Sequence, residues 1–142
     1  MERGITPDEV RAQVREFWEA LSQKSKDRFT SMYSSQATIM SSTARRPEMA
    51  RLMLVRRMRQ FFDPALSVKV EIGAVQVQIV GANTAIATYP YALRSTTANR
   101  DGSQTNRDTP HARATQIFQR REDGGLQIVH EHLSSGKQLA NI

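Results

Sequence analysis

The chain has no cysteine among its 142 residues. Because disulfides and thiolate metal sites both need cysteine sulfur, the sequence excludes a disulfide framework and a cysteine-ligated metal. Its apolar residues never run uninterrupted for the ~20 positions that a membrane-spanning helix needs. Residues 1–4 lead into a helix start without the apolar core and cleavage site of a secretory signal. We therefore expect a cytoplasmic protein that makes no membrane contact.

Aromatic residues are also scarce, at 6% of the chain with a single tryptophan, whereas hydrophobic residues make up 39% and charged residues 24%. These proportions are typical of a globular protein rather than a disordered one. The length is that of one ordinary domain. We expect residues 1–142 to form a single domain, with 135–142 as a loose tail.

The net charge of +6 is the one compositional feature that suggests an anionic partner. The basic residues are spread over the predicted helices, the segment 94–113 and the pair Arg120-Arg121. The sequence lacks an Arg/Gly-rich tail, an RNA-binding aromatic motif and zinc-finger spacing. It also lacks a phosphate-binding glycine loop, a nucleophile elbow and a His-Glu-x-x-His motif. Nucleic acid is therefore not the expected partner, and no cofactor is expected.

The best-signalled element is a helix that begins at Pro7. Thr6 stands at the N-cap position and Glu9 follows three residues later, which makes a capping box, and proline is favoured at the first helical position. The apolar residues that follow recur every three or four positions and form one stripe: Val10, Val14, Phe17, Trp18 and Leu21. We expect an amphipathic helix that packs its stripe on another layer.

Two further helices are predicted before residue 67. A short one covers 27–33, and residues 37–40 after it form a short strand or an extended exit. The longer one begins at Pro47 and ends at Asp63-Pro64, because proline disfavours helix in the residue before it. Its apolar face is broad and rich in methionine.

From residue 67 the apolar period changes to two, which indicates strands. Gly73 is expected to mark a bulge, and Pro90 an edge or a bend, because proline removes a ladder donor. The predicted order is strands over 68–72, 75–79 and 84–93, a long exposed loop over 95–109, a strand over 111–119, a turn at 123–125 and a strand over 126–133. Helices that precede hairpin-connected strands favour an α+β fold.

The segment from Ala114 to Gly136, ATQIFQRREDGGLQIVHEHLSSG, resembles the last hairpin of the SnoaL-like branch of the nuclear transport factor two-like superfamily. It is also similar to the association domain of calcium/calmodulin-dependent protein kinase. The residues that carry the likeness are Thr115, Ile117, Phe118, Arg120, Arg121, Asp123, Gly124, Val129, His130, His132 and Ser134. Residues 77–89, 16–21 and 32–39 resemble the family's middle hairpin, first helix and helix-to-strand junction.

The resemblance implies a cone-shaped, cystatin-like α+β roll: three N-terminal helices packed on a curved antiparallel sheet that encloses a pocket. It also implies a homodimer through the outer face of the sheet. In support, the last strand carries apolar residues on both faces, with Val129 and Leu133 on the face opposite Leu126 and Ile128.

One departure concerns catalysis. In members that resemble ketosteroid isomerase, the helix-to-strand junction carries an aspartate as general base, and counting from Tyr33 places Ser41 at that position. Gln36 replaces an earlier aspartate of the same junction, and Leu126 replaces a tryptophan of the last hairpin. Serine does not take up a proton near neutral pH, so proton abstraction would need another base.

Six residues are predicted to line the ligand site: Trp18, Tyr33, Tyr91, Arg113, His130 and His132. His130 and His132 lie two apart on a strand, so they leave one face together, and Glu131 leaves the other. Three roles are open to the two histidines: polar groups of the pocket, structural histidines, or, with a third ligand such as His111, a metal site. SnoaL-like proteins often direct an arginine at the cavity at the position of Arg113, and the kinase domain has one near Arg94. Tyrosine and tryptophan offer a ring and one polar tip.

Three hypotheses follow. The first is a small-molecule-binding domain with an enclosed, mostly apolar pocket for a small organic anion or a polyketide- or steroid-sized ligand. The second is an isomerase, cyclase or dehydratase with a histidine as general base. The third is an oligomerisation scaffold.

Overall fold

The computed structural model describes residues 4–41, 45–50, 52, 54, 56 and 62–135. Helix α1 covers Pro7–Ser22 and is capped as the sequence predicts, with the Thr6 hydroxyl oxygen accepting a hydrogen bond from the Glu9 backbone N–H at 3.2 Å. The whole predicted apolar stripe is buried. Helix α2, Lys26–Ser31, follows after a short turn and buries Phe29.

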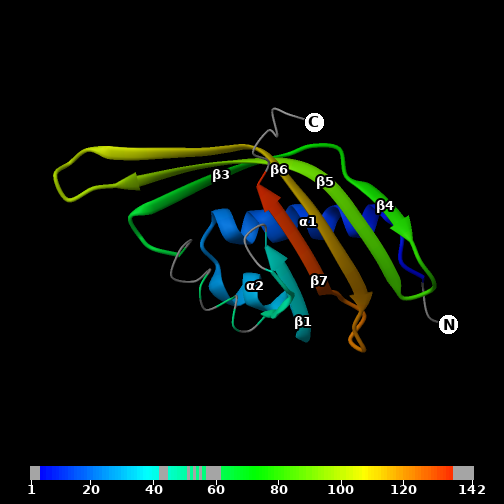
Figure 1. The fold of residues 1–142 in the computed structure, drawn as a ribbon. Helices are drawn as coiled ribbons and strands as arrows, with labels where there is room; N and C mark the ends of the chain where they lie inside the picture. Colours follow the sequence, from blue (N-terminus) through cyan, green and yellow to red (C-terminus); the bar gives the residue numbers. More distant parts are fainter. Residues whose placement is uncertain are drawn as a thin grey trace.

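The sheet has seven strands: β1 Tyr33–Ser41, β2 Glu48–Met49, β3 Leu66–Ile72, β4 Gln76–Ile79, β5 Thr84–Ala98, β6 Gln104–Arg120 and β7 Leu126–Ser135. Their order is β2-β1-β7-β6-β5-β3, and β4 pairs with β5 beside β3. Figure 1 shows the long strands bending around α1, which lies across one face of the sheet. The face towards α1 is called the inner face below, and the opposite one the outer face.

Two details of the predicted architecture need correction. The sheet is mixed rather than antiparallel, because β1 pairs with β7 in parallel. Hairpin connectivity alone could not reveal this pair, since its strands lie far apart in the sequence. The predicted third helix does not begin at Pro47, because Glu48–Met49 form β2. Ala50, Leu52, Leu54 and Arg56 are helical, and residues 62 and 63 are not. Residues 51, 53, 55 and 57–61 of that helix, and 136–142 of the predicted tail, lie outside the described residues.

The predicted loop over 95–109 is also wrong. The strands continue to Ala98 and resume at Gln104, so only residues 99–103 form the turn, where Gly102 has φ +86°. In Figure 1 this hairpin projects beyond the end of α1. Both of its faces are largely polar there, with contacts such as Thr96 Oγ1 to Asn106 Oδ1 at 3.0 Å. A strand that is exposed to solvent on both faces has no alternation of apolar and polar residues. The sequence of such a strand therefore resembles that of a loop.

Pro90 lies in the middle of β5, opposite the gap between β3 and β4. Its missing N–H belongs to the side on which the neighbouring strand is interrupted between β3 and β4. The Gly73 N–H donates to the Pro90 carbonyl oxygen there, at 2.9 Å. A Cβ at Gly73 would lie 2.6 Å from Pro90 Cγ, so the close approach requires glycine.

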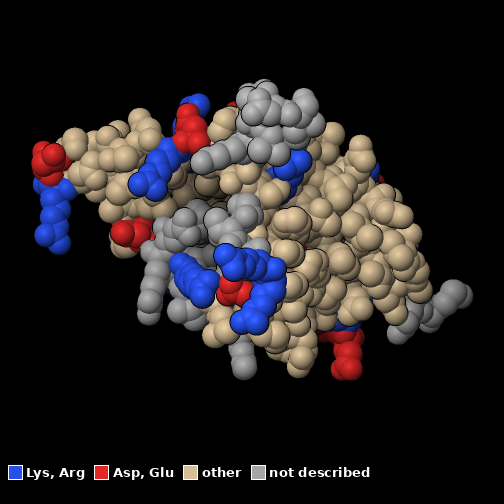
Figure 2. All heavy atoms as spheres, in the orientation of Figure 1, with Lys and Arg blue, Asp and Glu red and all other residues tan. Residues whose placement is uncertain are grey.

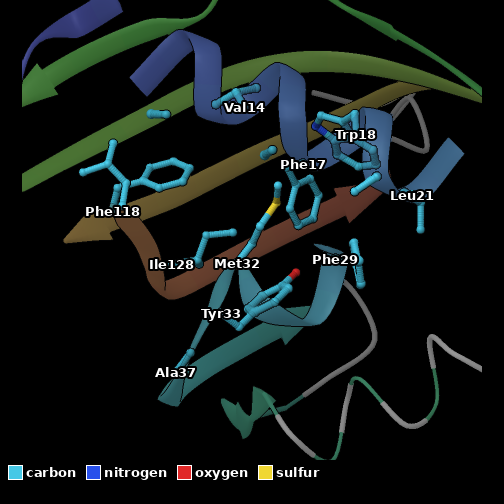
Figure 3. Close-up of a cluster of buried hydrophobic side chains, with 14 of the residues drawn as sticks. Val14, Phe17, Trp18, Leu21, Phe29, Met32, Tyr33, Ala37, Phe118 and Ile128 are labelled. Atoms are coloured by element: carbon cyan, nitrogen blue, oxygen red, sulfur yellow. The ribbon is translucent and has the colours of Figure 1, made fainter. Parts of the chain in front are cut away.

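The hydrophobic core fills the space between α1 and the inner face. Figure 3 shows Val14, Phe17, Trp18 and Leu21 of α1 directed at side chains of the strands, among them Phe118 and Ile128. Small residues on the inner face, Ala85, Ala87, Ala112 and Ala114, let the helix lie close to β5 and β6. The inner face is therefore where a buried functional group would lie.

Candidate functional site

A chain of hydrogen bonds crosses the core from α1 to β7. Trp18 Nε1 donates to Tyr89 Oη at 2.8 Å, and Tyr89 Oη donates to Gln116 Oε1 at 2.7 Å. Gln116 Nε2 donates in turn to Glu131 Oε2 at 2.7 Å. From the other side, Tyr33 Oη donates to both Glu131 oxygens, at 2.9 and 3.0 Å. These five residues are called the interior chain.

The interior chain is held out of water. Gln116 and Glu131 have no exposed surface, Trp18 and Tyr89 are each 4% exposed, and Tyr33 is 8% exposed. Gln116 and Glu131 meet because β6 and β7 pair them directly across the sheet. In the part of the chain that the structure describes, they are the only buried polar or charged residues besides tyrosine and tryptophan. A carboxylate at such a place is costly unless donors surround it.

The directions of the hydrogen bonds from Trp18 to Glu131 follow from the indole of Trp18. An indole N–H only donates, so the Tyr89 hydroxyl accepts from it and gives its own hydrogen to Gln116. The Gln116 amide must then present its oxygen to Tyr89 and its NH₂ group to Glu131. Burial raises the pKa of Tyr89 far above that of a free tyrosine, and the bond from Trp18 offsets only part of this, so the hydroxyl keeps its hydrogen. Glu131 is thus held as an acceptor of hydrogen bonds.

Aromatic rings surround the Tyr33 end of the chain. The Tyr33 ring centroid lies 5.9 Å from that of Phe17 and 5.7 Å from that of Phe29, and both contacts are edge-to-face. At the other end Tyr91 packs on Trp18 with 4.5 Å between ring centroids. The carboxylate therefore lies beside a largely apolar, aromatic environment, which is what a binding site for a small organic molecule requires.

The structure brings three of the six predicted site residues together and separates the other three from them. Trp18 and Tyr33 belong to the interior chain, and Tyr91 contacts Trp18. The other three lie on the outer face: Arg113, His130 and His132. His130 Nδ1 and Thr38 Oγ1 of β1 lie 2.7 Å apart there. Arg94, also on the outer face, pairs with Asp108 at 3.1 Å.

A bulge at Val129 decides which side chains of β7 face inwards. Phe118 of β6 pairs with Ile128, and the preceding Ile117 pairs with His130, so Val129 is an extra residue. The bulge shifts the alternation by one, which puts Glu131 on the inner face with Ile128. Leu133 also packs against the core, so the predicted grouping of Leu133 opposite Leu126 and Ile128 is wrong.

Sequence reasoning missed Gln116 and Glu131. Glu131 was set aside because it leaves the face opposite to the histidines, and the sequence alone does not tell which face is inside. A usable signal existed on β6: the small or apolar residues Ala112, Ala114 and Phe118 alternate with Arg113, Thr115 and Gln119. Gln116 lies in phase with the first set, which indicates a buried amide that needs a polar partner on the next strand.

Neither a metal site nor a membrane span is found in the described part of the chain. No three histidine, aspartate or glutamate side chains gather there to hold a metal ion. None of its helices is long and apolar enough to cross a bilayer. A hollow of about 150 Å³ on the outer face is open to solvent. Its lining residues are Lys69, Glu71, Ala92, Leu93, Arg94, Asp108 and Pro110.

Solved structures share this fold. A candidate dehydratase of the nuclear transport factor two-like family from Streptomyces avermitilis superposes with a TM-score of 0.75 at 18% identity, covering 93% of this chain and 99% of that one. A candidate calcium/calmodulin-dependent protein kinase II association domain from Xanthomonas campestris gives 0.71 at 17% identity, covering 98% and 97%. A protein from Catenulispora acidiphila, solved in complex with S-DNPA, gives 0.67 at 15% identity, covering 89% and 90%.

These likenesses show that the chain has the fold of nuclear transport factor two-like proteins. Residues 10–137 match the model of the SnoaL-like domain, and the chain belongs to that family. No match was found among curated proteins.

Proposed function

We propose that this chain is a small-molecule-binding domain whose ligand occupies the interior between α1 and the inner face of the sheet. The observation that carries the proposal is Glu131, a carboxylate without exposed surface towards which the donors of the interior chain converge. Trp18, Tyr33 and Tyr91 form the aromatic wall in this proposal. Arg113, His130 and His132 lie on the other side of the sheet and are assigned to an interface instead.

A purely structural role is the alternative for the interior chain. An apolar core of the same volume is often as stable as a buried polar one, or more so, because polar groups lose their hydration on burial. Five polar side chains from α1 and four different strands meet here, although the surrounding core is apolar. Such an arrangement is typical of a binding site, and the Catenulispora acidiphila protein was solved with a small molecule bound.

The charge of the site argues for a different ligand from the one that the sequence suggested. Arg113 and the two histidines pointed to an organic anion, but they do not face the interior. Among the residues described, the charged side chain there without exposed surface is Glu131, and the Arg120–Glu9 pair between β6 and α1 is partly exposed. A second negative charge beside Glu131 would be strongly unfavourable, so a neutral ligand fits the interior better.

Proton-transfer catalysis is the second candidate function. A histidine base is disfavoured by position, because His130 and His132 leave the outer face. Glu131 supplies a proton acceptor in their place, with the Tyr33 hydroxyl in contact with both its oxygens. Turnover of β-keto or enone substrates that is lost in Glu131→Gln and kept in His130→Ala would favour an isomerase, cyclase or dehydratase.

The single tryptophan makes the binding proposal testable. Trp18 lies in the interior chain, so a ligand that enters beside it should change its emission. We expect neutral phenols and cyclic alcohols to change the emission of the wild type and of His132→Ala, and to bind Glu131→Gln more weakly. Emission that no compound alters, or binding lost in Arg113→Ala and unchanged in Glu131→Gln, would contradict an interior site.

We also propose that the outer face joins two copies of the chain. Ile86 and Ile117 lie directly opposite each other there, both half-buried in the single chain. Figure 2 shows few charged side chains over β5, β6 and β7, whereas the projecting hairpin carries several. A face with an apolar centre and few charges is what a homodimer interface needs.

Ile117→Asp tests this face. A carboxylate at the centre of the interface would be buried without a partner, so we expect sedimentation velocity to show a monomer where the wild type is a dimer. Gln104→Asp, on the projecting hairpin, serves as the control and should leave the dimer intact. A wild type that is monomeric, or a dimer that persists in Ile117→Asp, would contradict the proposal. A mass well above that of a dimer would support the scaffold hypothesis.

A further inference from the structure

We propose that Glu131 selects its ligand by a hydroxyl group: the ligand is a neutral phenol or alcohol whose O–H takes the place of the Tyr33 hydroxyl on the Glu131 carboxylate. The inference rests on the proposed interior site and names the class of molecule that fits it.

The two donors to Glu131 described above differ in how firmly they are held. Gln116 is fixed, because its amide is oriented through Tyr89 by the donor-only indole of Trp18. Tyr33 is held differently. Its hydroxyl lies between the two carboxylate oxygens, at 2.9 and 3.0 Å, and a hydrogen shared in this way makes a weaker bond than one aligned on a single oxygen.

Tyr33 lies where a ligand can reach the Glu131 carboxylate from outside the core. Tyr33 is the most exposed member of the interior chain, and it stands at the first position of β1, next to the end of α2. Strand ends open more readily than strand centres. The pairing of β1 with β7 shifts register between Tyr33 and Thr38. This end of β1 therefore has a less regular hydrogen-bond pattern than the rest of the strand.

The aromatic rings around Tyr33 limit the shape of the ligand that can replace its hydroxyl. The Tyr33 ring meets the rings of Phe17 and Phe29 edge-to-face. A ligand with an aromatic or alicyclic ring can make the same contacts, while its hydroxyl reaches Glu131. The Tyr33 side chain itself thus shows which ligand chemistry this part of the interior accepts: a ring with one hydrogen-bond donor.

Ligands without a neutral hydrogen-bond donor do not fit the Glu131 carboxylate. A ketone or an ether offers Glu131 only an acceptor, so the hydrogen bond lost with the Tyr33 hydroxyl would not be replaced. A carboxylate or phosphate adds like charge. A hydroxyl group supplies the hydrogen that Glu131 accepts without adding charge.

The test uses para-cresol, which is the side chain of tyrosine as a free molecule, and its methyl ether, which has the same ring and no donor. Binding is followed by Trp18 emission and by the shift of the thermal unfolding midpoint. For the wild type we expect the ether to bind about tenfold to hundredfold more weakly than para-cresol, the loss typical of one buried hydrogen bond left unmade. In Glu131→Gln, whose amide can donate to the ether oxygen, this preference should fall to within about threefold.

Tyr33→Phe separates this mechanism from a merely structural role. It removes the competing hydroxyl and keeps the ring, so para-cresol should bind the variant more tightly than the wild type. His132→Ala is the control, because His132 lies on the outer face and its loss leaves the bonds of the interior chain in place. It should change neither affinity nor preference.

The outcomes distinguish the inference from the proposed function. Equal binding of para-cresol and its ether to the wild type, or weaker binding of para-cresol to Tyr33→Phe, overturns the selection by hydroxyl and leaves the interior site standing. Binding of neither probe to the wild type and Tyr33→Phe overturns both. If Tyr33→Phe does not fold, the comparison of the wild type with Glu131→Gln decides.

Discussion

Replacing Gln116 with leucine is expected to lower the free energy of unfolding by about 3–5 kcal/mol. The substitution removes the acceptor of the Tyr89 hydroxyl and one donor of the Glu131 carboxylate, and both of these groups are buried. A buried polar group that loses its partner keeps the cost of dehydration without the compensating bond. Chemical denaturation followed by Trp18 emission measures the loss. A change below about 1 kcal/mol would mean that the interior chain is not closed as described.

Gln116→Glu is the matched variant, since it keeps the shape of the side chain and places a second carboxyl group opposite Glu131. When protonated, the new carboxyl can accept from Tyr89 and donate to Glu131, as the amide does. Burial and the neighbouring charge raise its pKa in the folded state above the unfolded value of about 4.3. Its contribution to stability is therefore present below that value and is lost as the pH rises through the raised pKa. We expect the stability gap to the wild type to widen towards neutral pH, whereas Gln116→Leu should show no such trend.

Phe17→Ala is expected to cost about 3–5 kcal/mol of folding free energy. Phe17 is 1% exposed and contacts the rings of Trp18, Phe29 and Tyr33, with centroids 5.0, 5.1 and 5.9 Å away. Its removal leaves a cavity between α1 and the sheet that these rigid rings cannot fill.

Two variants calibrate that result. Phe17→Leu keeps most of the volume and should cost less than about 2 kcal/mol. Val80→Ala, at a side chain that is 49% exposed, should change stability by no more than about 0.5 kcal/mol. Equal losses for Phe17→Ala and Val80→Ala would contradict the packing of α1 on the inner face.

The elements whose signals are local could be predicted from the sequence. Thr6, Pro7 and the apolar stripe specify α1 with its cap, because capping and helical periodicity depend on residues within a few positions of each other. The turn at 123–125 and the interrupted strand pairing beside Pro90 follow from the backbone limits of glycine and proline in the same way. The membership of the SnoaL-like family, suggested by the last hairpin, is confirmed.

The features that depend on distant contacts could not be predicted in this way. One extra residue at Val129 reverses the alternation of β7, and a bulge of this kind leaves no glycine or proline in the sequence. The faces of His130 and Glu131 were therefore open until the pairing with Ile117 and Phe118 was known. The parallel pair of β1 with β7 and the continuation of β5 and β6 through the polar segment 95–109 were hidden for the same reason. Each is decided by a partner strand rather than by its own residues.

The difference bears directly on function. The sequence directs attention to two histidines and an arginine because these are the residues that most often carry chemistry. The structure places them on the outer face and places a glutamate, a glutamine and three aromatic residues with polar tips inside. A homodimer through the outer face and a ligand at the inner face would then use opposite sides of one curved sheet.

The most direct test is a crystal structure of the protein grown with para-cresol. We expect the molecule to lie between α1 and the inner face with its oxygen within hydrogen-bonding distance of the Glu131 carboxylate. Para-cresol bound beside Arg113 or His130 on the outer face, with Tyr33 still on Glu131, would contradict the interior as the ligand site.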